Sequence, residues 1–369
     1  MAADVLNVIA ARPQRAGLKL WLKRLHLWLG LSAGLVFALI ALSGSVLALQ
    51  EPLLRLAHPA LTGHVPPSPA QQARVLARIA HEWAPCGLRA ADLPDAALPV
   101  WQLYFDNGTR RYLDPASGEL LLTRDASRDA LLILRNWHTH LLAGRTGENL
   151  LGVLGWIALG LLLSGLVLWW PARGRLRAHL RPYAQPPVRR WLTWHRSLGA
   201  LTLPLLLLVT LTGTLMVYHG ATRRGLEAAF GRGTVAAPPS PVARRDAPVP
   251  WAALLAAAQS ALPHAALSRI SFGQADDATV VVRAHAPGEW NATGRSMIWL
   301  DPYTPRVLAV RDASAGDTAA RIDGMIYPLH AGTVGGWAYR GVVIACGVLP
   351  AFFVTTGFLF WRARTRRRR

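Results

Sequence analysis

The stretch "WLTWHRSLG" at residues 191–199 is followed at 200–218 by "ALTLPLLLLVTLTGTLMVY", an apolar run without a charged residue. A hydrocarbon core ~30 Å thick is crossed by about 20 apolar residues at a rise of 1.5 Å each. The second stretch therefore predicts a membrane-spanning helix, with His195 at its start. This histidine could anchor the helix at the membrane interface or bind a ligand, and repeats of the same motif elsewhere in the chain help to distinguish the two roles.

Four apolar runs of membrane-spanning length occur in the 369 residues, and none carries a charge: 27–49, 150–170, 198–218 and 341–361. The chain is 52% hydrophobic, with a mean hydropathy of +0.25. This composition is too apolar for an ordinary soluble protein. The first run is longer than the apolar part of a signal peptide, and no A-x-A cleavage site follows it, so it predicts a retained helix.

Positive charge is concentrated beside these runs. Residues 1–25, 171–197 and 362–369 hold 18 of the 40 Lys and Arg residues but only one of the 20 acidic residues. The positive-inside rule places such short basic segments in the cytoplasm, so both larger segments lie on the outer side of the membrane. The net charge of +20 therefore indicates topology and contact with anionic lipid, and we expect no nucleic-acid partner.

The sequence contains an internal repeat. "HLWLGLSAGLVFALIALSG" (26–44) aligns without gaps with "HRSLGALTLPLLLLVTLTG" (195–213), which matches His26 with His195. A second register matches His138 with His330 and "SGLVLWWPAR" with "TGFLFWRAR". The segments between the runs also correspond, because each has a helix-like stretch followed by short strands. Asp-Pro turns predict hairpins around "YLDPASGELL" and "WLDPYTPRVL".

We therefore expect an α-helical membrane protein with four transmembrane helices and two α+β modules on the outer side of the membrane, in tandem duplication. The expected divisions are a cytoplasmic N-terminus at 1–26, a helix at 27–49, the first module at 50–137, an outer segment and helix at 138–170, a cytoplasmic loop at 171–197, a helix at 198–218, the second module at 219–329, an outer segment and helix at 330–361, and a basic cytoplasmic tail at 362–369.

These motifs resemble the PepSY-associated transmembrane family of bacterial inner-membrane proteins. The resemblance covers about residues 20–365 and is carried by "LHLWLGL", "WHRSLGA", "WHTHLLAGRTG", "LHAGTVGG" and the two hairpins. The second hairpin departs from the usual Asp-Pro-x-x-Gly by reading "DPYTP". The resemblance implies that the two α+β modules are PepSY-like and periplasmic. Some members of the family are similar to haem-containing reductases that pass electrons outward to ferric siderophores.

The matched histidines are candidate haem ligands. Haem b iron takes two axial ligands, and facing helices of a bundle commonly supply them as histidines. A single histidine at a helix end is more often an interface residue, but two matched pairs at equal spacing favour ligation. We expect two haems b, one near the inner face held by His26 and His195 and one near the outer face held by His138 and His330.

The outer pair poses a geometric problem, because His138 and His330 lie 12 and 11 residues before the apolar runs that follow them. Either the outer haem lies at the surface, or the segments that lead into the helices fold back into the bundle. His140 and His219 are the alternative outer ligands.

Other chemistry is disfavoured by missing motifs. The two cysteines, Cys86 and Cys346, have no Fe–S spacing, and the sequence has no Walker or dinucleotide-binding glycine motif. Electrons would come from a cytoplasmic donor or the quinone pool. Together with the matched histidines, the resemblance implies a haem-dependent transmembrane reductase of a periplasmic ferric chelate such as a ferrisiderophore, which releases ferrous iron. The alternative is a non-enzymatic PepSY binding module that regulates a periplasmic protease or assists an uptake system.

Overall fold

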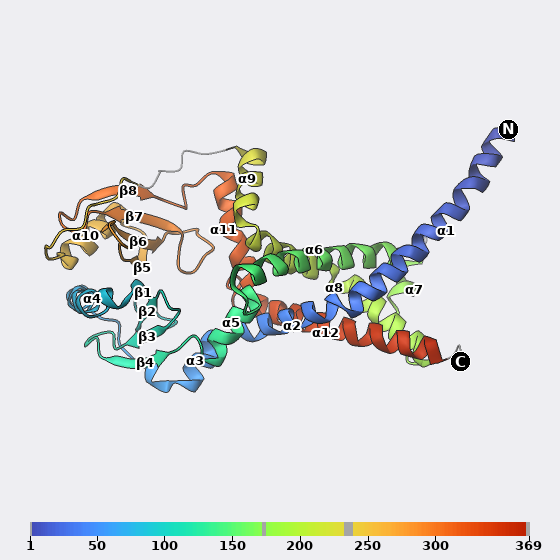
Figure 1. The fold of residues 1–369 in the computed structure, drawn as a ribbon, viewed down its shortest axis with the longest axis horizontal. Coiled ribbons are helices and arrows are strands. Elements are labelled where there is room, and N and C mark those ends of the chain that lie inside the picture. Colours follow the sequence, from blue (N-terminus) through green and yellow to red (C-terminus); the bar gives the residue numbers. More distant parts are fainter. Residues whose placement is uncertain (1, 172–174, 232–238, 367–369) are drawn as a thin grey trace. The chain divides into compact units, whose positions relative to one another are not determined.

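The computed structural model describes residues 2–171, 175–231 and 239–366, and these residues form two compact units (Figure 1). The described residues of the helical unit lie within Met1–Ala48, Asn136–Tyr218 and Leu329–Arg369. Those of the sheet unit lie within Leu49–Arg135 and His219–Pro328. Each unit therefore collects segments from both halves of the chain.

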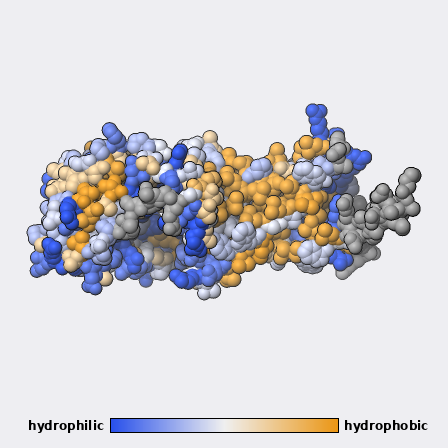
Figure 2. Space-filling view, turned by 90° about the horizontal axis from the view of Figure 1, so that it is seen from above, coloured by the Kyte–Doolittle hydropathy of each residue, from blue (hydrophilic) through white to orange (hydrophobic). Residues whose placement is uncertain are grey.

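Helices α6, α8 and α12 are each long and apolar enough to cross a membrane. Helices α1 and α2 are bent by 48° at Ser32 and add a fourth span if the bent pair counts as one. Apolar residues cover much of the visible face of this unit, as a lipid-facing surface requires (Figure 2). The helices of the unit are α1 (Ala2–Leu31), α2 (Ala33–Leu47), α6 (Gly144–Trp169), α7 (Leu176–Leu180), α8 (Pro187–Val217) and α12 (Gly336–Arg366).

Two short helices, α5 (Ala130–His140) and α11 (Thr318–Ala331), precede α6 and α12 and are separated from them by breaks. In the first break, Leu141 and Leu142 have φ angles of 48° and 59°. In the second, Gly332 and Gly335 have φ angles of 69° and 66°. This left-handed conformation ends a helix and favours glycine, so the chain changes direction at both places.

The sheet unit is built on one antiparallel sheet of eight strands in the order β4-β3-β2-β1-β5-β6-β7-β8. Both predicted hairpins are confirmed, because β3 pairs with β4 and β7 pairs with β8. The strands are β1 (Leu88–Asp92), β2 (Trp101–Phe105), β3 (Arg110–Leu113), β4 (Leu120–Arg124), β5 (Ala266–Ser271), β6 (Val280–His285), β7 (Ser296–Leu300) and β8 (Val307–Arg311). The central pair β1–β5 joins the two halves of the chain, which the sequence had suggested as separate modules.

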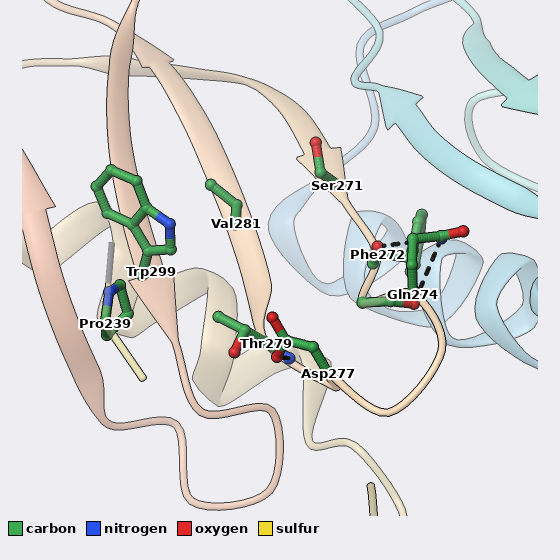
Figure 3. Close-up of a pocket in the computed structure, with 9 residues that line it drawn as sticks. Pro239, Ser271, Phe272, Gln274, Asp277, Thr279, Val281 and Trp299 are labelled. Carbon is green, nitrogen blue, oxygen red and sulfur yellow. Dashed lines mark hydrogen bonds between the residues drawn. The ribbon is translucent and has the colours of Figure 1, made fainter. Parts of the chain in front are cut away.

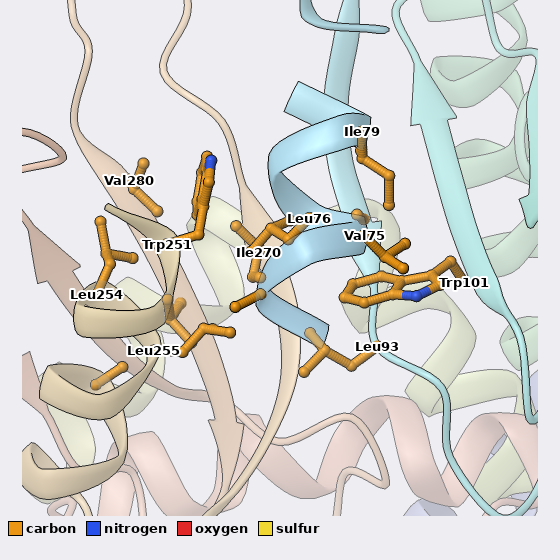
Figure 4. Close-up of a cluster of buried hydrophobic side chains, with 14 of the residues drawn as sticks. Val75, Leu76, Ile79, Leu93, Trp101, Trp251, Leu254, Leu255, Ile270 and Val280 are labelled. Carbon is orange, nitrogen blue, oxygen red and sulfur yellow. The ribbon is translucent and has the colours of Figure 1, made fainter. Parts of the chain in front are cut away.

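One face of the sheet is covered by α4 (Pro69–Trp83) and α10 (Trp251–Ala261), which bury a shared apolar core against it (Figure 4). Trp101, Ile270 and Leu254 are fully buried there, and burial of such a side chain contributes roughly 1.5–3 kcal/mol. Helix α4 starts sharply because Ser68 and Gln71 form a capping box. The remaining elements are α3 (Gln50–Ala57), α9 (His219–Phe230) and the 3₁₀ turns Pro59–Leu61 and Ala84–Cys86.

Candidate functional site

The structure brings His26 and His195 together inside the helical unit. His26 lies on α1 and His195 on α8, and their ring centres are 6.4 Å apart. The Nδ1 atom of His26 lies 2.8 Å from the Ser164 hydroxyl of α6. The Nδ1 atom of His195 lies 3.0 Å from the Thr356 hydroxyl of α12. We call these two histidines the inner pair; each is held by a hydroxyl of a neighbouring helix.

His138 and His330 form the outer pair, with ring centres 6.2 Å apart. They lie near the ends of α5 and α11, and each packs on the helix of the preceding apolar run. The Nδ1 atom of His138 is 2.9 Å from the Ile40 carbonyl and 3.0 Å from the Ser43 hydroxyl on α2. The Nδ1 atom of His330 is 3.0 Å from the Val209 carbonyl on α8. Of the two arrangements that the sequence left open, the structure has the one in which the outer segments fold back into the bundle.

The hydrogen bonds at Nδ1 define which nitrogen of each ring carries the proton. The hydroxyls of Ser164 and Thr356 donate to carbonyls of their own helices, Leu161 and Phe352, at 3.0 and 2.8 Å. Their oxygens are therefore left to accept a hydrogen bond from the Nδ1–H of the histidines. In the outer pair the carbonyl acceptors impose the same tautomer. The lone pair of each imidazole then lies on Nε2, the atom that a metal would bind.

Glycines give the outer rings their space. A Cβ atom added to Gly44 would lie 2.8 Å from Cε1 of His138, and one added to Gly213 would lie 2.7 Å from Cε1 of His330. Real Cβ atoms do not approach so closely, so an alanine at either position would displace the ring. Gly165 and Gly357 face His26 and His195 more loosely, with corresponding distances of 3.4 and 3.8 Å.

The distances within both pairs fit bis-histidine ligation of a haem. A metal–nitrogen bond of about 2.0 Å on each side, with roughly 1.1 Å more from each nitrogen to its ring centre, separates two axial imidazoles by about 6 Å between centres. The observed separations are 6.4 and 6.2 Å. Within the described ranges, no group of three or more His, Cys, Asp or Glu side chains could hold a metal ion, whereas a haem needs only two axial ligands from the protein.

The two pairs lie near opposite ends of the long helices. On the continuous helix α8, His195 and Gly213, which touches His330, are 18 residues apart. At 1.5 Å per residue this is about 27 Å, close to the ~30 Å thickness of a hydrocarbon core. One pair would therefore lie at each side of the membrane.

The structure places the two alternative outer ligands elsewhere. The Nδ1 atom of His140 bonds to the hydroxyl of its neighbour Thr139 at 2.7 Å. His219 is 59% exposed, and its Nε2 atom lies 3.4 Å from the Asp323 carboxylate in the sheet unit. Neither is brought into a pair with another histidine, whereas His138 is.

The sequence had not identified the hydroxyl residues as part of the site. The signal was present, because a Ser or Thr immediately precedes each of the four glycines that face the rings. These dipeptides are Ser43-Gly44, Ser164-Gly165, Thr212-Gly213 and Thr356-Gly357. Each supplies a hydroxyl near a histidine Nδ1, although Thr212 lies farther from its histidine, at 3.4 Å. In the outer pair the glycine also leaves a gap for the ring.

The fold defines an integral membrane protein with two units. The helical unit contains the two histidine pairs, and the sheet unit is built on one antiparallel sheet. The family described as PepSY-associated TM region matches residues 23–364, and the chain belongs to this family. No curated protein matches the chain in a sequence comparison.

Proposed function

We propose that the protein is a haem b electron carrier of the bacterial inner membrane that reduces a ferric chelate in the periplasm. The observation that supports this most directly is the geometry of the inner and outer pairs. Each brings two imidazoles with their lone pairs on Nε2 to the separation that an axially ligated iron needs. The two pairs are about 27 Å apart, measured along α8, which is close to the thickness of a membrane's hydrocarbon core.

A bound haem b would supply one-electron redox chemistry at each pair. The chain's contribution is to fix the ligands: the hydroxyls and carbonyls orient the imidazoles, and the surrounding helices exclude water. One electron converts ferric to ferrous iron, which oxygen-rich chelators hold less tightly, so the metal is released. The electron would come from a quinol or a cytoplasmic reductant.

The proposed topology has four spans, with both termini and the loop at 171–197 in the cytoplasm. It rests on the basic residues beside the apolar runs. The proposed origin is a tandem duplication. It is supported by the matched roles of His26 and His195, of His138 and His330, and of the Ser/Thr-Gly dipeptides that face them.

Haem content tests the proposal. The protein purified in detergent should show reduced α and Soret bands and two haems b per chain in a pyridine haemochrome assay. His195→Ala and His330→Ala should each lose one haem, because an iron left with one axial ligand is held much more weakly. The matched control is His264→Ala, an exposed histidine of the sheet unit, which should keep both haems. A haem-free protein after expression with ample haem, or full haem in both ligand variants, would refute the proposal.

A further inference from the structure

The second face of the sheet, opposite α4 and α10, carries a row of arginines. Strand register aligns Asp92, Arg269, Arg283, Met297 and Arg311 across β1, β5, β6, β7 and β8. Side chains at such directly opposed positions are about 5 Å apart at Cβ, and like charges there repel. We call this row, from Asp92 to Arg311, the arginine row.

Two members of the row lack a carboxylate partner. Arg269 pairs with Asp92, its Nη2 lying 2.9 Å from Oδ2. Arg283 and Arg311, both partly buried, make no ion pair within the part of the chain that the structure describes. Arg311 donates instead to the carbonyl of Arg295 and to the Met297 sulfur, at 3.4 and 3.0 Å. Both acceptors are neutral, so neither forms an ion pair with the Arg311 guanidinium.

Nearby carboxylates are already engaged. Asp323 accepts a hydrogen bond from Arg295 at 2.6 Å, and Glu289 accepts one from the Ser296 hydroxyl at 2.5 Å. The pKa of Arg283 is lowered by burial and then by the charge of Arg269. The pKa of Arg311 is lowered by burial and then by Arg295. Both guanidiniums stay charged at neutral pH, so an added anion would relieve the repulsion between them.

A pocket of about 250 Å³ lies on the same face of the sheet as the row. Figure 3 shows the residues that line it. Ser271, Val281 and Trp299 line it from three neighbouring strands. Each lies two residues along its strand from a member of the arginine row, a step of about 7 Å. The Arg311 guanidinium also lies over the Trp299 ring, 5.8 Å from its centre, and so connects the row with the pocket.

The acidic residue that lines the pocket, Asp277, lies in the loop between β5 and β6. The Oδ1 atom of Asp277 accepts hydrogen bonds from the backbone N–H groups of Thr279 and Val242, at 2.9 and 3.2 Å. These bonds hold the carboxylate at the loop. The rest of the wall is an aromatic ring, an aliphatic side chain and small polar groups, which suits the uncharged body of a small ligand.

We propose that this face binds the ferric substrate as an anion, a carboxylate-rich ferric chelate. Arg283 and Arg311 pair with its carboxylates, and the Trp299 pocket holds part of its body. Guanidinium groups bind carboxylates through paired charge-assisted hydrogen bonds, so this ligand matches the unused donors of the row. The identity of the ligand as an iron chelate rests on the proposed function; the preference for an anion rests on the arginine row alone.

Calorimetric titration of the full-length protein in detergent with gallium(III) citrate tests the site. Gallium is not reduced, so binding is measured apart from electron transfer. Arg283→Gln and Arg311→Gln should each weaken binding about tenfold or more, and Arg283→Lys should recover part of the loss. The matched control is Arg306→Gln, which removes the same charge from an exposed turn between β7 and β8 and should change binding less than twofold. The affinity of the parent protein should fall as salt is raised.

Equal loss in the Arg306→Gln control or unchanged binding in both row variants would overturn the proposal. So would equal affinity for a gallium(III) tris-hydroxamate chelate that carries no negative charge. Tighter binding of a glutamate-rich peptide than of gallium(III) citrate would also overturn it, and would assign the face to an acidic protein segment. Arginine-dependent binding in a protein without haem would refute the proposed function and leave the anion site standing. Haem and ferric reduction without such binding would refute the anion site alone.

Discussion

At the scale of single residues, the histidine pairs depend on neighbours as much as on the histidines. A ligand imidazole needs its second nitrogen bonded so that the tautomer and the ring orientation are fixed. Here hydroxyl and carbonyl oxygens accept from Nδ1 on all four rings. In the outer pair, the glycine beside each hydroxyl leaves the space that the ring occupies. The Ser/Thr-Gly dipeptides are therefore positioning residues, and none would touch the iron.

The Gly213→Ala substitution tests this residue-scale reading. Its Cβ would lie 2.7 Å from Cε1 of His330, so the ring must shift and the outer haem should be lost or held 10–100-fold more weakly, the range for disturbed ligand support. Haem per chain and the reduced spectrum measure the effect. The matched control is Gly160→Ala on α6, where an added Cβ meets nothing within 4 Å. Similar haem loss in both variants would show that helix glycines matter only for general stability.

At the scale of elements, apolar runs and turn residues were sufficient to predict α6, α8, α12 and both hairpins, but not the 48° bend at Ser32 that divides the run at 27–49 between α1 and α2. They could not predict that α5 and α11 are separate helices, because the breaks include Leu141 and Leu142 in a left-handed conformation that leucine rarely adopts. The sequence matched His138 with His330, but their contact depends on tertiary packing against α2 and α8. Likewise, nothing local in β1 and β5 indicated that these strands would pair.

The connection of β4 with α5 provides a pH-dependent prediction. Arg124 at the end of β4 is 5% exposed and pairs with Asp129, its Nη2 lying 2.6 Å from Oδ1. The hydrogen bond from Arg124 lowers the pKa of Asp129 below its ordinary value. A carboxyl group whose pKa is lowered by folding stabilises the folded state at pH values above its unfolded pKa of about 3.9. This stabilisation is lost as the pH falls through the lower pKa of the folded state.

Asp129→Asn should therefore lower the free energy of unfolding at pH 7 by about 2 kcal/mol, because Arg124 keeps its charge in a buried site. The difference from the parent protein should shrink as the pH falls from neutral to below about 4. Urea unfolding followed by tryptophan fluorescence at several pH values measures it. Asp276→Asn, an exposed carboxylate of the same unit, is the control and should change little. A difference that stays constant with pH would contradict the ion-pair explanation.

At the scale of the whole molecule, the sheet binds the two halves of the chain into one structure. Segments from both halves also meet in the helical unit, where each histidine pair takes one member from either half. The site therefore could not be assembled by one half alone. Removing either half should abolish both haems together.

The two cysteines test the proposed orientation. Cys86 is exposed in the sheet unit, whereas Cys346 is buried on α12. A membrane-impermeant maleimide should label Cys86 in cells whose outer membrane alone has been opened, and Cys346 should react only after unfolding. The variant Cys86→Ser should then take up no label. If Cys86 is labelled only after the inner membrane has been opened, the orientation is the opposite of the proposed one.

The strand order β4-β3-β2-β1-β5-β6-β7-β8 is palindromic: exchanging the halves of the chain leaves it unchanged. Two separate half-length chains related by a two-fold axis would give the same order through an isologous β1–β1 contact. Such a dimer would dissociate on dilution and lose both histidine pairs at once. Joining the two halves in one chain replaces that equilibrium with a fixed, high effective concentration of each half near the other. The sequence of each half can then change independently, whereas any substitution in a symmetric dimer appears in both subunits.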